Sequence, residues 1–127
     1  MTVQAGTEEN RRQRAIARQD VASMTRFVEG LVESAFGIAH SALHAPGRGA
    51  AKIAFARQVA MYLCCVRLGH SCSAAGRFFG RDRTTAAHAC RVIEERRENS
   101  SVDSLIDCLE RAIDMRRQAD AAWSDGA

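Results

Sequence analysis

The segment from residue 82 to residue 91 carries polar side chains suited to contacting nucleic acid. It opens with Asp82-Arg83-Thr84-Thr85 and continues with His88 and Arg91 at helical spacing. An arginine can donate two hydrogen bonds to a guanine edge, an aspartate can accept one from cytosine, and a threonine methyl can contact that of thymine. The segment therefore predicts a DNA-reading helix, whose chemistry is hydrogen bonding rather than bond making.

Two further helices must position this segment. Apolar residues at three- and four-residue spacing predict a central core helix over about residues 50–68. A short helix follows to about residue 79, and either Ser71 or Ser73 can cap it. Gly80-Arg81 then forms the turn into the third helix.

Asp82 is expected as the N-cap of that third helix, because a carboxylate there accepts hydrogen bonds from the free amides of the first turn. The short and third helices then make a helix-turn-helix over about residues 71–98. In such a motif the start of the second helix enters the major groove of DNA.

Flanking helices are predicted on both sides of the motif, and the fold class is all-α: a single-domain helical bundle. Amphipathic spacing predicts a helix over 16–36, a short helix over 38–43, a loop at 45–49 and a last helix over about 101–116. The expected division is a flexible N-terminal tail at 1–15, a helical DNA-binding domain at 16–117 and a flexible C-terminal tail at 118–127.

Three stretches together resemble the C-terminal DNA-binding domain, domain IV, of the DnaA family of bacterial replication initiators. They read A-R-Q-V-A-M at 56–61, G-R-D-R-T-T-A-A-H-A at 80–89 and C-R at 90–91. The resemblance implies a DnaA domain IV/Trp-repressor-like helix-turn-helix that binds a specific sequence of double-stranded DNA.

The resemblance also implies roles for individual side chains. Base contacts are expected from Asp82, Arg83 and Thr84 and, more weakly, from Ser73. Contacts with the DNA backbone are expected from Arg57, Gln58, Arg81, Thr85, His88 and Arg91. Minor-groove contacts are expected from Arg48 and Lys52.

Two positions depart from the family pattern. Arg83 stands where the family usually has histidine, so the preferred sequence need not be the standard DnaA box. The 45–49 loop carries only Arg48 where the family has a basic cluster, with Lys52 a turn later. Its glycine neighbours permit close approach of the backbone to DNA, but affinity is expected to be lower than for a full initiator domain.

Charge is unevenly distributed along the 127 residues, whose formal net charge is +3. Residues 47–97 hold ten basic and three acidic side chains, a net of +7, while the remainder has a net of −4. A basic module between acidic flanks is typical of a polyanion-binding protein. An arginine-rich solvated surface is the alternative interpretation, and seventeen of the eighteen basic residues are arginine.

The sequence gives no support for an enzyme, a nucleotide-binding protein or a membrane protein. The chain has no G-x-x-x-x-G-K-[ST] loop, and Lys52 is its one lysine, so no nucleotide or other cofactor is predicted. No apolar run approaches the roughly 20 residues of a membrane span, and the N-terminus lacks the apolar core of a secretory signal. The chain is therefore expected in the cytoplasm, associated with the nucleoid.

Metal and redox chemistry are likewise not predicted. The five cysteines lack C-x-x-C spacing and are expected as small buried residues. His40 and His44 are four residues apart and on a helix could hold a metal with two further ligands. No carboxylate or cysteine stands beside them in the sequence, so no metal site is expected.

Three functions remain open at this stage. The first is a transcription regulator that contacts RNA polymerase or another regulatory protein through an acidic outer face on its last helix. That face would comprise Asp103, Asp107, Glu110 and Asp114. The second is a replication-control factor acting at DnaA boxes or on regulators of DnaA. The third is a protein adaptor with a vestigial helix-turn-helix, which the retained DNA-facing residues disfavour.

Overall fold

The computed structural model describes residues 2–126, with side chains from residue 6, and the regular secondary structure of these residues is all helical, without strands. This confirms the all-α class. The elements are α1 (Thr2–Phe36), the 3-10 helix η1 (Ala42–His44), α2 (Ala51–Val66), α3 (Cys72–Phe78), α4 (Arg83–Arg96) and α5 (Ser100–Gly126).

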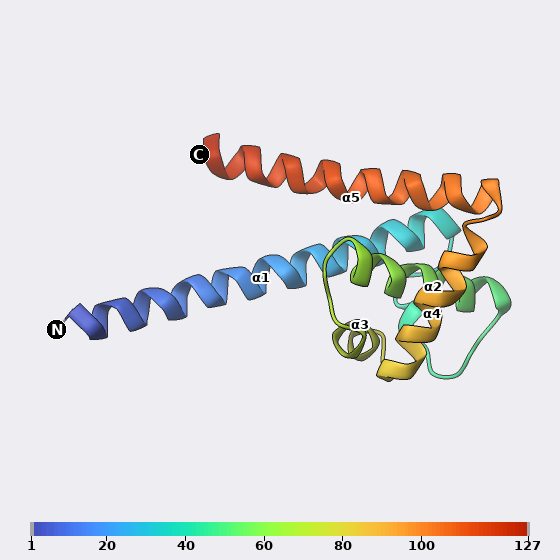
Figure 1. Ribbon diagram of the computed structural model, residues 1–127, viewed down its shortest axis with the longest axis horizontal. Coiled ribbons are helices and arrows are strands. Elements are labelled where there is room, and N and C mark those ends of the chain that lie inside the picture. Colours follow the sequence, from blue (N-terminus) through green and yellow to red (C-terminus); the bar gives the residue numbers. More distant parts are fainter. Residues whose placement is uncertain (1, 127) are drawn as a thin grey trace.

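Helix α2 lies at the centre of a compact group formed with α3, α4 and the second half of α1 (Figure 1). Its buried positions follow the predicted apolar spacing, and Val59, Ala60 and Leu63 are fully buried. Apolar side chains from the neighbouring segments pack around it, among them Val32 of α1 and Phe79 after α3. Burial of this continuous apolar core supplies the main force that holds the helices together.

Helices α1 and α5 are longer than predicted. Helix α1 begins at Thr2 rather than near Ile16, and α5 continues to Gly126 rather than ending near residue 117. The extra turns of both are exposed where their side chains are described. Polarity suggested irregular tails, but Ala, Glu, Gln and Arg favour helices and no proline interrupts either segment. These helix bounds do not test the predicted division of the chain into a helical domain at 16–117 and two flexible tails, which stays a prediction.

The predicted short helix at 38–43 is wrong in extent and type. The structure has only the 3-10 turn of η1 there, because Gly37 and Ser41 both take positive φ angles, 63° and 71°, that no helix accommodates. These two residues turn the chain sharply between α1 and α2. Leu43 of η1 is nevertheless fully buried, so the turn contributes to the core.

Helix α5 packs on the domain through the predicted apolar stripe, in which Ile106 and Ile113 are fully buried. Asn99 caps it by accepting from the backbone amides of Ser101 and Val102 at 2.9 and 3.2 Å. Glu110 was expected on an exposed acidic face, and that prediction is wrong. Glu110 is buried, because arginines from two other segments of the chain turn toward it.

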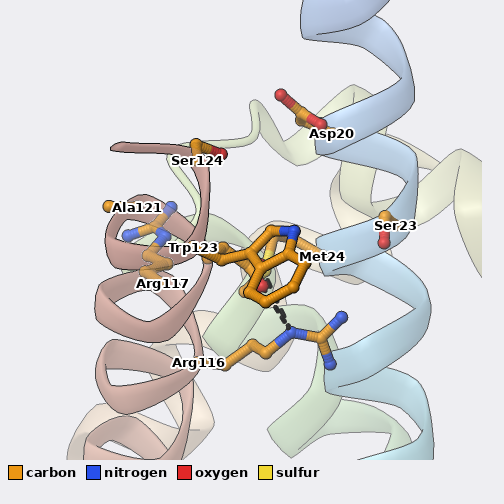
Figure 2. A pocket seen from close by; sticks show the side chains of 9 residues that line it. Asp20, Ser23, Met24, Arg116, Arg117, Ala121, Trp123 and Ser124 are labelled. Atoms are coloured by element: carbon orange, nitrogen blue, oxygen red, sulfur yellow. Dashed lines mark hydrogen bonds and ion pairs between the residues drawn. The ribbon is translucent and has the colours of Figure 1, made fainter. Parts of the chain in front are cut away.

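The middle of α1 and the C-terminal part of α5 flank an open cleft of about 450 Å³ (Figure 2). Trp123 of α5 points across it toward Met24 of α1, and Arg116 pairs with Asp120 within α5 at 3.1 Å. The Trp123 ring is largely exposed. Among the described residues, no helix combines the length and apolar character needed to cross a membrane.

Candidate nucleic-acid interface

The helix-turn-helix consists of α3, a tight turn and α4. Ser71 caps α3 by accepting from the amide of Ala74 at 3.1 Å, which settles the choice between the two serines predicted as caps. Gly80 turns the chain with a φ of 70°, and the Arg81 amide donates to the Gly76 carbonyl at 2.7 Å. A Cβ atom at Gly76 would stand 2.6 Å from the Asp82 carbonyl oxygen. The close crossing of α3 and α4 therefore requires glycine at this position.

Asp82 caps α4 as predicted. Its carboxylate Oδ1 accepts from the Thr85 amide at 2.8 Å, and this backbone hydrogen bond lowers the pKa of Asp82 below its usual range. The side chain stays exposed, so the carboxylate is ionised at the start of α4 and accessible to a partner.

Helix α4 has one buried and one exposed face. Ala86, Ala89 and Ile93 point into the core. The opposite side of the helix is exposed and includes Arg83, Thr84, Thr85, His88 and Arg91. Cys72 of α3 joins Arg83, Thr84 and Arg91 around a shallow depression of about 270 Å³ at the start of this face.

A second hollow of about 520 Å³ lies beside the exposed face of α4. Seven predicted site residues line it and are thereby brought together. They are Arg48, Arg57, Gln58, Arg81, Asp82, Thr85 and His88. The hollow thus joins the 45–49 loop, α2 and the start of α4, three segments that are separate in the sequence.

Arg57 is buried in this hollow, only 5% exposed, and braces the loop that precedes α2. Its Nε donates to the Leu43 carbonyl at 2.7 Å and its Nη1 to the Arg48 carbonyl at 3.3 Å. Its Nη2 is buried without a hydrogen-bond partner in the part of the chain that the structure describes. Burial, and to a lesser extent the positive charge of Arg81, lowers the pKa of Arg57. A buried cationic donor without an acceptor is costly, and an anion in the hollow would relieve that cost.

Arg81 holds the same loop from the other side. Its Nη2 donates to the carbonyls of Ala45 and Gly47 at 2.8 and 2.6 Å, and its Nη1 donates to the Phe79 carbonyl at 2.9 Å. The turn of the helix-turn-helix is thereby fastened to the loop that carries Arg48. Sequence reasoning did not find this structural role, because nothing in the local sequence marks which carbonyls lie nearby.

Two predicted site residues stand apart from both hollows. Lys52 is exposed, and its Nζ lies beside Gly37. Ser73 is half-buried on α3. Neither lines the hollows that contain the other predicted residues.

The cysteines divide by environment. Cys64 is buried in α2, and burial raises its pKa to about 12, which makes it an inert core thiol as expected. Cys65, Cys72 and Cys90 are half-buried, and their thiols are close enough to interact with one another. Cys108 is exposed, so the expectation that the cysteines are buried is wrong there.

Comparison with known proteins points to one family. A family model described as the bacterial dnaA protein helix-turn-helix matches residues 25–93. The chain is also similar to the chromosomal replication initiator protein DnaA of Psychromonas ingrahamii, with 42% identity over 65 residues. That similarity covers 50% of this chain and 14% of the relative's length. The family match runs from the last third of α1 through nearly all of α4 and includes the capped turn and the exposed helix face described above. The chain therefore belongs to the family of bacterial DnaA helix-turn-helix domains.

Proposed function

We propose that the protein binds a specific sequence of double-stranded DNA, with α4 in the major groove and the hollow against the phosphate backbone. One observation carries the proposal: the exposed face of α4 carries basic side chains that no other described part of the protein engages. Within residues 2–126, no hydrogen bond or ion pair engages the side chains of Arg83, His88 or Arg91. A solvated surface would also leave them free, but here they adjoin a hollow that contains a buried, partly unpartnered guanidinium.

The individual roles follow from position. Asp82, Arg83 and Thr84 lie in the first turn of α4, which is the part of a recognition helix that reaches base edges, and Ser73 stands on the preceding helix. Arg57, Gln58, Arg81, Thr85 and His88 would donate to phosphates around the hollow, with Arg91 further along α4. Arg48, and more remotely Lys52, would approach the minor groove from the loop side.

Binding should weaken steeply as salt is added. If the interface makes about five to eight phosphate contacts, the slope of log affinity against log salt should be on the order of −4 to −7. Fluorescence anisotropy with the full chain and a duplex selected from random DNA measures this slope. A flat salt dependence, or no binding to any genomic duplex, would instead support the protein-adaptor interpretation.

Arg83→Ala should relax sequence preference at a single base pair. Loss of a bidentate contact with guanine costs about 1–3 kcal/mol of discrimination against the other bases. Arg83→His restores the residue usual in the family and should shift preference toward the DnaA box. Selection from random DNA, run on wild type and both variants, measures these preferences. Recovery of one motif from all three proteins would refute the base-reading role of Arg83.

Transcription regulation is the biological role that we propose for this binding. Two departures from the family pattern support this role: Arg83, and the 45–49 loop with its single basic residue. A factor that acts at DnaA boxes should keep the residues that read them. The 42% identity with a replication initiator favours the alternative, replication control at DnaA boxes. Genome-wide mapping of bound DNA separates the two: sites at promoters support the first role, and sites at clustered DnaA boxes support the second.

A further inference from the structure

Two glutamates and two histidines come together between α1 and η1, outside the DNA-facing surface. We call Glu29, Glu33, His40 and His44 the Glu-His cluster. The two glutamates are one helical turn apart on α1, and each is only 7% exposed. The histidines come from the turn after α1, which brings them back beside these carboxylates.

The atoms of the cluster are spaced like metal ligands. One carboxylate oxygen from Glu29, one from Glu33 and one ring nitrogen of His40 all lie within 4.8 Å of one another. His40 Nδ1 is 3.3 Å from Glu33 Oε1, and His44 Nε2 contacts Glu29 Oε2. Around a tetrahedral zinc ion, whose ligands lie at 2.0–2.2 Å, neighbouring ligand atoms are roughly 3.3 Å apart. Glu29, Glu33 and His40 therefore need little movement to enclose an ion, whereas His44 lies outside this group of three and contacts Glu29.

The charge of the cluster also calls for a cation. Glu29 and Glu33 are buried carboxylates one helical turn apart, and the basic groups beside them are the imidazoles of His40 and His44. Within residues 2–126, no lysine or arginine nitrogen lies within ion-pair distance of either one. By contrast, the buried Glu110 has two arginine partners. A divalent ion bound to both carboxylates would cancel their charge without a basic side chain.

The backbone holds this arrangement in a strained conformation. Ser41, between the two histidines, has a left-handed φ of 71°, which is uncommon for a residue other than glycine. In this conformation its amide donates to Glu33 Oε2 at 2.8 Å. That hydrogen bond fixes one oxygen of Glu33 and leaves Oε1 facing His40.

We propose that the Glu-His cluster binds one divalent transition-metal ion. Two carboxylates and the His40 imidazole supply three ligand atoms, and the His44 imidazole beside Glu29 is the candidate for a fourth. This mixed nitrogen and oxygen set suits zinc and its first-row neighbours better than magnesium or calcium. The ion joins α1 to the turn that follows it and so secures the chain that precedes the Arg48 loop. The site goes beyond DNA binding and does not depend on it.

Zinc titration of the metal-free full chain by isothermal calorimetry tests the proposal. We expect one Zn²⁺ per chain, no comparable binding of Mg²⁺, and a zinc-dependent rise in the thermal unfolding midpoint. His40→Ala should weaken zinc binding by at least about tenfold, the loss that even outer-shell partners of a metal produce. The His40 side chain is 82% exposed, so its removal leaves the core intact. Glu33→Gln should weaken zinc similarly while keeping the side-chain shape.

Cys72→Ser is the control, because a thiol is also a zinc ligand and that of Cys72, which interacts with Cys65 and Cys90, lies outside the Glu-His cluster. The proposal requires that zinc affinity survive this substitution. It is overturned if wild type binds no zinc, if His40→Ala binds zinc as tightly as wild type, or if Cys72→Ser removes the binding.

Discussion

Arg57→Ala should both destabilise the protein and weaken its binding to every DNA sequence about equally. The substitution removes the donor to the carbonyl of the buried Leu43 and the brace on the Arg48 loop. An unsatisfied buried group costs about 1–3 kcal/mol of unfolding free energy, measurable by urea titration. Loss of a charge-assisted phosphate contact of about 1.5–3 kcal/mol should lower DNA affinity roughly tenfold to a hundredfold, measurable by anisotropy.

Gln58→Ala is the matched comparison for that prediction. Gln58 is the next residue on α2, lines the same hollow, and makes no hydrogen bond within residues 2–126 through its side chain. Its removal should weaken DNA binding modestly and leave the unfolding free energy within about 0.5 kcal/mol of wild type. If Arg57→Ala is as stable as Gln58→Ala, the loop-bracing role of Arg57 is wrong.

The helix-turn-helix was predictable because local sequence determines it. Asp82 can cap only the helix that follows it, and Gly80 marks the preceding turn through its left-handed φ. Apolar spacing in α2 and α4 indicated which faces are buried, and the exposed face of α4 followed as the complement. The exposed site residues on α4 could therefore be predicted from the sequence.

Side chains that act across long sequence separations were harder to place. Arg57 was predicted as a phosphate donor, and its burial depends on a loop that returns from residues 43–48. The Glu-His cluster was missed for the same reason, since Glu29 and His44 meet only because Gly37 and Ser41 reverse the chain. Residue types and spacing do not reveal such reversals.

The charge pattern of α5 gave a wrong prediction for Glu110 for the same reason. Its spacing with Asp103, Asp107 and Asp114 suggested a solvated acidic face. The structure places Glu110 between Arg67, at the end of α2, and Arg97, at the end of α4, at 3.0 Å from each. Arg97 also donates to Asp103 at 2.6 Å and to the Tyr62 hydroxyl at 3.1 Å. Three helices therefore meet at this carboxylate.

Glu110→Ala should produce the largest loss of stability among changes to the charged residues of α5. Removing one partner of a buried ion pair typically costs 3–5 kcal/mol. The side chains of Arg67 and Arg97 are 38% and 20% exposed, so water can solvate part of the charge left behind. We therefore expect a loss of about 2–3 kcal/mol of unfolding free energy, measured by urea denaturation of the full chain.

Asp107→Ala provides the control for Glu110→Ala, one turn earlier on the same helix. Asp107 pairs with Arg111 at 2.6 Å on the helix surface, where such pairs contribute only about 0.3–0.5 kcal/mol. Equal losses from the two substitutions would show that Glu110 does not anchor α5. Under conditions where Glu110→Ala is folded, its DNA affinity should match wild type, because its ion pairs involve none of the side chains on the exposed face of α4 or around the adjoining hollow. A fall in both stability and DNA affinity would instead mean that α5 holds α4 in its binding position.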